Sequence, residues 1–150
     1  NKGIEAIAIN VSGELFAIPE KPPRQENRYP LYRYMNKKWD IVTNFPADGP
    51  FLVTDADFLS DNSLIVLERD HNWATGFRTR IRRISFVNDK VTKIDILLET
   101  KASSANNEGL SIWYNSKNQP MITIISDNNF LPFIDTELTE YKLVILNDIK

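Results

Sequence analysis

The chain has 150 residues, of which 42% are hydrophobic and 25% charged, a composition typical of one folded domain and not of a disordered or collagen-like chain. With 18 Lys and Arg against 20 Asp and Glu, its net charge of −2 gives no reason to expect nucleic acid as a partner. Its apolar runs are far shorter than the roughly 20 residues of a membrane-spanning helix, so no membrane span is predicted. The absence of cysteine and the single histidine exclude disulfides, thiol nucleophiles and zinc sites that need two histidines. Because the first residue is Asn1, we expect a chain that was processed or cut from a longer one.

The hydrophobic pattern predicts an almost entirely β protein, because short alternating or β-branched runs are separated by turn residues. The expected strands are Ile4–Asn10, Glu14–Ile18, Leu31–Met35, Lys38–Thr43, Leu52–Leu59, Ser63–Arg69, Phe77–Val87, Lys90–Leu98, Leu110–Tyr114, Met121–Ser126 and Thr139–Leu146. The expected turns are Ser12-Gly13, Asn36-Lys37, Asp61-Asn62, Asn88-Asp89 and Lys117-Asn118.

One pattern occurs three times along the chain: a strand, a tight turn, and an apolar strand that ends in a carboxylate. From turn to turn, 49 residues separate Gly13 from Asn62 and 56 separate Asn62 from Asn118, which suits a four-stranded propeller blade of roughly 40–50 residues. We therefore predict an all-β fold, a β-propeller fragment of about three four-stranded antiparallel blades at residues 1–48, 49–100 and 101–150. Because closed propellers use about four to eight blades, we expect half of a six-bladed ring, completed by the rest of the propeller or by a homo-oligomer.

Six short motifs, spread over nearly the whole chain, occur in the order seen in bacterial phytase-like domains, described as having "esterase-like activity of phytase". The motifs are Asn1-Lys-Gly-Ile-Glu-Ala, Leu15-Phe-Ala-Ile-Pro-Glu20, Asp55-Ala-Asp-Phe-Leu, Leu64-Ile-Val-Leu-Glu-Arg-Asp70, Asn107-Glu-Gly and Ser126-Asp-Asn-Asn-Phe130. The chain resembles the C-terminal half of such a domain. The resemblance implies a longer β-propeller that hydrolyses phosphate esters or carboxylic esters and is periplasmic or secreted.

In a propeller the innermost strands line a central channel, and loops at one rim usually form the site. Carboxylates cluster where this rim is expected, and Ca²⁺ prefers ligands of this kind because it takes about 6–8 oxygen atoms. The candidate metal ligands are Glu5, Glu20, Glu68, Glu108 and Asp127, with Asp55, Asp57 and Asp70 nearby and amide oxygens from Asn107, Asn128 and Asn129. Alternatively, these Asp and Asn side chains cap turns and accept backbone hydrogen bonds.

Basic residues allow two interpretations at each place where they occur. Arg69 either forms an ion pair with an acid of a neighbouring blade, or it binds a substrate anion while the adjacent Glu68 serves as a metal ligand. Arg78, Arg80 and Arg82 share one face of a strand, where they either hold a polyphosphate or, as the sequence favours, protect an exposed sheet edge.

Two classes of function follow. The first is a calcium-dependent phosphoester or ester hydrolase, in which the metal activates water and neutralises phosphate charge. Its catalytic residues would be Glu68 and His71. The residues expected to bind a small phosphorylated or ester substrate are Arg69, Arg78, Arg80, Asn128 and Asn129. A metal-dependent lactonase is a variant of this hypothesis. In the alternative, a non-catalytic propeller binds a ligand or a protein, and both the carboxylates and His71 have no chemical role.

Overall fold

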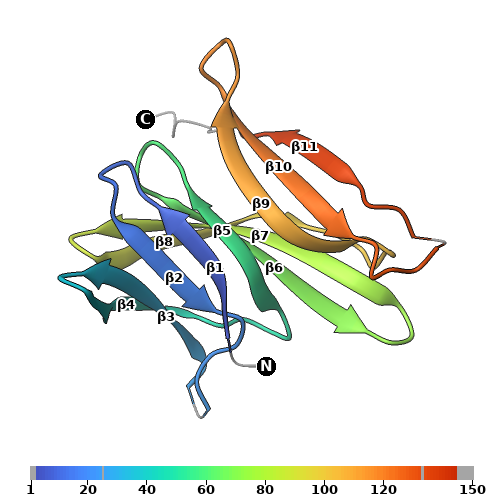
Figure 1. Ribbon diagram of the computed structural model, residues 1–150, viewed down its shortest axis with the longest axis horizontal. Coiled ribbons are helices and arrows are strands. Elements are labelled where there is room, and N and C mark those ends of the chain that lie inside the picture. Colours follow the sequence, from blue (N-terminus) through green and yellow to red (C-terminus); the bar gives the residue numbers. More distant parts are fainter. Residues whose placement is uncertain (1–2, 25, 133, 145–150) are drawn as a thin grey trace.

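The computed structural model describes residues 3–24, 26–132 and 134–144. Within these ranges the chain forms eleven strands in three antiparallel sheets and no helix, which confirms the all-β prediction (Figure 1). None of the described residues therefore forms a helix that could cross a membrane. Sheet 1 contains β1 (Ile4–Ile9), β2 (Leu15–Pro19), β3 (Arg28–Met35) and β4 (Lys38–Pro46). Sheet 2 contains β5 (Leu52–Phe58), β6 (Leu64–Asn72), β7 (Gly76–Val87) and β8 (Lys90–Glu99), and sheet 3 contains β9 (Asn106–Tyr114), β10 (Pro120–Asp127) and β11 (Leu138–Lys142).

Tight turns join neighbouring strands where the sequence predicts them. Asn36 and Lys37 have φ of 53° and 62°, and Asn88 and Asp89 have φ of 50° and 60°. Two consecutive positive φ angles are the mark of the hairpin turn whose twist matches that of the flanking strands. The remaining predicted turns also contain a residue with positive φ: Gly13, Asn62 and Asn118.

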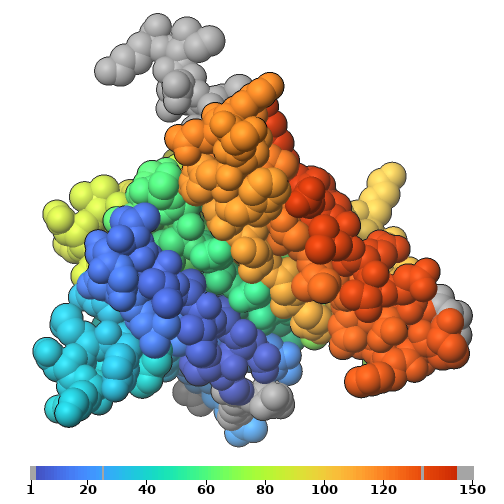
Figure 2. Space-filling model, turned by 45° about the horizontal axis from the view of Figure 1, so that its top comes forward, coloured from blue at the N-terminus to red at the C-terminus, as the bar shows by residue number. Residues whose placement is uncertain are grey.

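The three sheets follow one another in space, with sheet 2 between sheets 1 and 3. Figure 2 shows their first strands side by side on one face, β1 in dark blue, β5 in green and β9 in orange. Neighbouring propeller blades place their innermost strands in this way. A propeller ring itself stays a prediction, as does the division at residues 1–48, 49–100 and 101–150. Residues 1–2 of the first motif and 145–146 of the expected last strand lie outside the described residues.

The core lies between the sheets and has two parts. Phe16, Ile18, Tyr29 and Phe45 of sheet 1 pack with Leu64 and Val66 of sheet 2, and Ile65 and Leu67 of the same strand β6 pack with Ile122 and Ile124 of sheet 3. The apolar run 64–67 is thus buried on both faces, as expected for the middle sheet of three. β6 is therefore the strand from which side chains reach both neighbouring sheets.

Asp55 and Asp57 connect sheet 2 to sheet 3. The Oδ2 atom of Asp55 accepts a hydrogen bond from the backbone N–H of Leu110 at 2.6 Å, and Oδ2 of Asp57 accepts one from Ile112 at 2.8 Å. Burial raises the pKa of Asp55, against the lowering effect of its bonds to backbone N–H groups. These two carboxylates hold β9 against β5, which is the structural alternative considered for them.

Two of the three arginines on this face of β7, Arg80 and Arg82, are buried and not at an exposed edge, so the sequence-based expectation is wrong for them, whereas the Arg78 side chain is 37% exposed. Arg80 and Arg82 are each 2% exposed and both bind Glu68, whose exposure is 0%. β8 pairs with the outer side of β7, and the connection from β4 to β5 covers this face of sheet 2. The Arg80 guanidinium lies 4.2 Å from the centre of the Phe51 ring, and that of Arg82 lies 5.4 Å from the centre of Phe45.

Candidate functional site

A cleft of about 160 Å³ lies at one end of the first strands. Antiparallel sheets with the same strand order place the beginning of each first strand and the end of each second strand at the same end, so residues distant in sequence meet there. Four candidate residues from the sequence, drawn from all three sheets, line one cleft. Its lining consists of Glu5, Glu20, Val53, Thr54, Arg69 and Glu108.

Arg69 is the central group of the cleft. It comes from β6 and forms an ion pair with Glu108 of β9, while its Nη1 donates a hydrogen bond to Oδ1 of Asn106 at 2.5 Å. Its guanidinium also lies 5.6 Å from the centre of the Phe77 ring. The interpretation that Arg69 pairs with an acid of the neighbouring sheet is confirmed, and the pair places a cation and a carboxyl group side by side in a concave site.

The pKa of Glu108 is raised above its ordinary value. Burial is the largest cause, and the negative charge of Asp127 adds to it, while Arg69 and a hydrogen bond from Asn106 act in the opposite direction. A carboxyl group with a raised pKa keeps its proton closer to neutral pH, where it can serve as a proton donor. Glu108 is therefore the residue of the cleft best suited to acid–base chemistry.

Glu20 offers a free acceptor in the same cleft. Its Oε2 is buried and has no hydrogen-bond partner among the described residues, and Nζ of Lys21 lies 3.8 Å away. The backbone of Glu20 is fixed where β2 ends: its N–H donates to the carbonyl of Gly3, and its carbonyl accepts from the N–H of Val53, both at 3.1 Å. Glu5 is exposed at the mouth.

Other candidate residues point away from the cleft, because side chains along a strand alternate between its faces. Glu68 lies on the opposite face of sheet 2 from Arg69, with its two carboxylate oxygens bound to Arg80 and Arg82. Arg78 is on that same face, bound to Asp70 at 2.7 Å. The structure does not bring these residues together with Glu5, Glu20 and Glu108.

His71 lies further along β6, on the same face as Arg69. Its ring stacks on Phe77 with centres 4.5 Å apart, and the exposed Trp73 meets it edge-on at 4.9 Å. Phe77 thus lies between His71 and Arg69. These aromatic contacts fix the imidazole just outside the cleft lining.

Asp127 is the last residue of β10, and Asn128 and Asn129 follow it in the turn. Oδ1 of Asp127 accepts from the N–H of Asn129, and Oδ1 of Asn128 accepts from that of Phe130, both at 3.0 Å. These are the turn-capping bonds that the sequence offered as an alternative to metal binding. Oδ1 of Asn129 also accepts a hydrogen bond from Nδ2 of Asn106 at 2.9 Å, which links this turn to the cleft.

Asn106 was not among the residues predicted from the sequence. It is 2% exposed and joins Arg69 to Asn129 by the two hydrogen bonds described above. The sequence could have indicated Asn106, because it lies two residues before Glu108 and residues two apart on a strand share a face. Asn107 was considered instead, and its Nδ2 donates to Oγ1 of Thr79.

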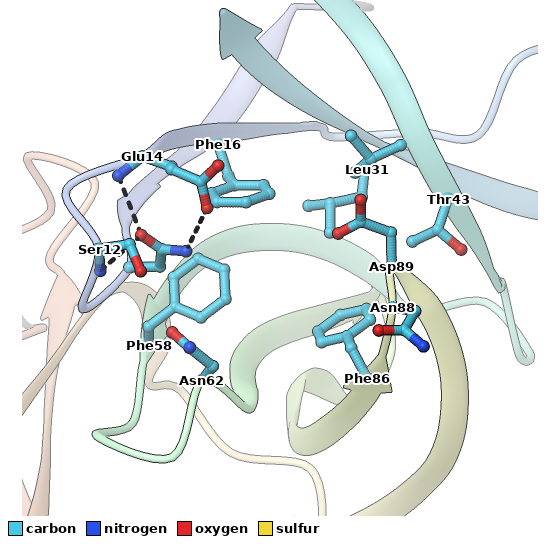
Figure 3. A pocket seen from close by; sticks show the side chains of 12 residues that line it. Ser12, Glu14, Phe16, Leu31, Thr43, Phe58, Asn62, Phe86, Asn88 and Asp89 are labelled. Atoms are coloured by element: carbon cyan, nitrogen blue, oxygen red, sulfur yellow. Dashed lines mark hydrogen bonds between the residues drawn. The ribbon is translucent and has the colours of Figure 1, made fainter.

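A second hollow, of about 220 Å³, lies between sheets 1 and 2 at the opposite end of the strands (Figure 3). Figure 3 shows the rings of Phe16, Phe58 and Phe86 within it. Its carboxylates are engaged, because Arg33 binds Glu14 and Asp89 at 3.4 and 3.2 Å. It contains none of the candidate residues, so the cleft around Arg69 is the better candidate site.

A solved structure is similar over 93% of this chain at 10% sequence identity, with a TM-score of 0.37, and is described as a protein of unknown function from Bacteroides caccae. The chain spans 61% of that structure's length. No curated protein matches. A family model described as "Phytase-like: Esterase-like activity of phytase" matches residues 1–130. The chain therefore belongs to the phytase-like family.

Proposed function

We propose that the cleft binds and hydrolyses a small phosphate ester or carboxylic ester, with Arg69 binding the anionic oxygen and Glu108 supplying a proton. The observation that carries this proposal is the pair itself: a guanidinium beside a half-buried carboxyl group of raised pKa, both in the lining of a cleft. Membership of the phytase-like family supports the same class of reaction.

The reaction needs a base, an acid and a cation. Glu20, whose buried Oε2 has no hydrogen-bond partner among the described residues, takes the proton of the attacking water. The substrate anion replaces the Glu108 carboxylate at Arg69, and Glu108, no longer paired, takes up a proton from solvent. The new bond forms between the water oxygen and phosphorus or the acyl carbon, the bond to the ester oxygen breaks, and Glu108 gives this proton to the leaving oxygen. Arg69 stabilises the negative charge that develops on the remaining oxygens.

Calcium is the cofactor expected from the sequence, and carboxylates are its usual ligands. The described residues contain no group of three or more Asp, Glu and His side chains placed to hold a metal ion, and Glu108 is already neutralised by Arg69. The described part of the cleft does not by itself fit calcium, so no step is assigned to the ion. Glu5 and Glu20 are the carboxylates of the cleft that no arginine binds.

A second candidate function is binding of an anion without turnover. The ion pair favours it, because Arg69 and Glu108 neutralise each other and an incoming anion would have to replace the carboxylate. Such exchange needs only one arginine and a cleft.

The test is turnover by the purified chain with p-nitrophenyl phosphate, p-nitrophenyl acetate, a lactone and phytate, each with calcium and with EDTA. Glu108→Gln is expected to lower kcat by about 10²–10⁴ and to remove the alkaline limb of the pH profile, since a general acid is lost. Glu99→Gln, an exposed carboxylate on β8 that lies 3.8 Å from Arg78, is the matched control.

Three results decide between the candidates. Turnover that depends on Glu108 supports hydrolysis, and equal rates with EDTA exclude a calcium role. Calorimetric binding of inorganic phosphate that Arg69→Gln abolishes, without turnover, supports the binding function. Neither turnover nor binding, or Glu108→Gln activity equal to that of Glu99→Gln, contradicts the hydrolase proposal.

A further inference from the structure

The hollow of Figure 3 lies between sheets 1 and 2, two neighbouring sheets of this chain. It has a volume of about 220 Å³, and residues of the β1–β2, β5–β6 and β7–β8 turns contribute to its lining. At the roughly 30 Å³ that one water molecule occupies in the liquid, this volume has room for about seven non-hydrogen atoms. Because both walls belong to the described chain, the hollow does not depend on what covers the outer faces of sheets 1 and 3.

The interior of the hollow is apolar and aromatic. Phe16 and Leu31 of sheet 1 are 6% and 2% exposed. The ring of Phe16 lies 5.0 Å from that of Phe58, tilted by 56°, and Phe86 packs against the same core cluster. The alkyl part of a small ligand would leave water there and contact three aromatic rings from two sheets.

A β-bulge shapes the wall that β4 provides. Val42 and Thr43 are consecutive residues of β4, and both line the hollow, although consecutive strand residues normally point to opposite faces. The pairing of β3 with β4 shifts between Leu31 and Tyr32, which leaves Val42 as an extra residue of β4. Bulges redirect side chains in this way and are frequent beside binding sites.

The charged residues of the hollow are acidic. Its described lining contains Glu14 and Asp89 and neither lysine nor arginine. Arg33, outside the lining, contacts both carboxylates, at 3.4 and 3.2 Å, whereas close charge-assisted hydrogen bonds are about 2.7–2.9 Å long. The carboxylate side chains are 38% and 52% exposed, and each carboxylate can accept about four hydrogen bonds. One arginine beside two carboxylates leaves one negative charge in excess.

The turn that carries Asp89 holds this charge at a fixed position. Asn88 and Asp89 have φ of 50° and 60°, the two positive values of a tight hairpin turn. Figure 3 shows the Asp89 carboxylate directed towards the space between the rings of Phe16, Phe58 and Phe86. Aromatic rings and a carboxylate therefore face one small space.

We propose that this hollow binds a small organic cation, an alkylammonium ion, with its alkyl groups against the three phenylalanine rings and its charge beside Asp89 and Glu14. Aromatic rings attract such a cation through their negative faces, and the excess carboxylate charge acts in the same direction. The two carboxylates repel an anion, so this hollow and the cleft around Arg69 select ligands of opposite charge. The inference is independent of the function proposed for that cleft.

The test compares two probes of about the size of the hollow that have nearly the same shape. Choline is a quaternary ammonium ion, and 3,3-dimethylbutanol has a carbon atom in place of the charged nitrogen. Each is titrated into the isotope-labelled protein at constant ionic strength, and the amide signals are followed by NMR. We expect choline to shift the signals of the β1–β2, β5–β6 and β7–β8 turns saturably at millimolar concentrations, and the neutral alcohol to bind about tenfold more weakly.

Two variants separate the charge from the aromatic floor. Asp89→Asn keeps a residue suited to positive φ and is expected to weaken choline binding about two- to fivefold, without changing the affinity for the alcohol. Phe86→Leu is expected to weaken the binding of choline more than that of the alcohol, because it removes a ring and retains an apolar side chain. The matched control is Asp95→Asn, since Asp95 on β8 lies outside the lining and pairs with Lys93 at 3.1 Å.

Three results would overturn the proposal. The first is the absence of a saturable shift with choline at the three turns, and the second is equal affinity for choline and the alcohol. The third is choline binding by Asp89→Asn as strong as that by Asp95→Asn. Stronger binding of choline than of the alcohol, reduced by Asp89→Asn and by Phe86→Leu, supports a site for an organic cation.

Discussion

Replacing Glu68 with glutamine removes the only negative charge that touches both Arg80 and Arg82 in the described chain. Oε2 of Glu68 accepts from Nε of Arg80 at 2.7 Å, and Oε1 is bound by Arg82. Glu68 is 0% exposed and the two arginine side chains are 3% and 2% exposed. Glutamine has the same shape, so the change isolates the charge and leaves the packing intact.

The size of the effect follows from this burial. Removing one partner of a buried ion pair leaves an uncompensated charge and costs about 3–5 kcal/mol. Arg80 retains a second partner, Asp48, whose Oδ2 lies 3.3 Å from Nη1, but Asp48 is 69% exposed and compensates little. Arg82 retains only the carbonyl of Pro46 at 2.9 Å, and its Nε has no hydrogen-bond partner among the described residues. We therefore expect Glu68→Gln to lower the free energy of unfolding by about 3–5 kcal/mol.

Urea unfolding followed by circular dichroism measures the loss. With a slope of about 2 kcal/mol per molar urea, a loss of about 4 kcal/mol lowers the midpoint by about 2 M. The control is Glu99→Gln, whose partner Arg78 is 3.8 Å away and 37% exposed, and which is expected to cost less than about 1 kcal/mol. Equal midpoints for Glu68→Gln and Glu99→Gln would show that the buried network does not hold β6 to β7.

Burial and the charge of Glu68 raise the pKa of Tyr29 from 10.0 to about 12, so the folded state holds this proton more tightly than the unfolded state. The free energy of unfolding is therefore expected to fall by roughly 2 kcal/mol as the pH rises from about 10 to about 12. Tyr29→Phe should show no such alkaline loss in thermal unfolding. Asp57→Ala removes the acceptor of the Ile112 N–H and should cost about 1–3 kcal/mol, with faster hydrogen exchange at that amide. Gly76→Ala should destabilise by more than about 1 kcal/mol, because Gly76 has φ of 93° and a Cβ there would lie 2.3 Å from the carbonyl oxygen of Ser103; a thermal midpoint equal to wild type would contradict this last expectation.

The strands and their turns could be predicted because their signals are local. Alternation fixes a strand within a few residues, and pairs such as Asn36-Lys37 provide the positive φ that a tight hairpin needs. The run 64–67 was recognised as a strand by its apolar residues alone, and burial between two sheets explains why it lacks alternation.

The direction of each side chain could not be predicted in the same way. Register shifts interrupt the pairing of β1 with β2 between Ile4 and Ala6, and of β5 with β6 between Val53 and Asp55. The pairing of β9 with β10 shifts at the corresponding place, so the first strand of each sheet has one extra residue there: Glu5, Thr54 and Glu108. All three line the cleft, whereas Asp55, the residue after Thr54, accepts a backbone hydrogen bond from β9. Because an extra residue breaks the alternation of a strand, alternation alone could not predict which side chains point into the cleft.

The contrast between Glu68 and Arg69 shows how one strand serves both stability and the site. Both are charged and adjacent, yet Glu68 faces sheet 1 within a closed ion network, and Arg69 faces sheet 3, where its partner Glu108 lies in a cleft. Because β6 is fixed on one face by Glu68, Arg69 on the other face is presented at a constant position relative to β9. A rigid scaffold of this kind is what precise placement of a binding group requires. The loss of Glu68 should therefore weaken anion binding at Arg69 even under conditions where the protein remains folded.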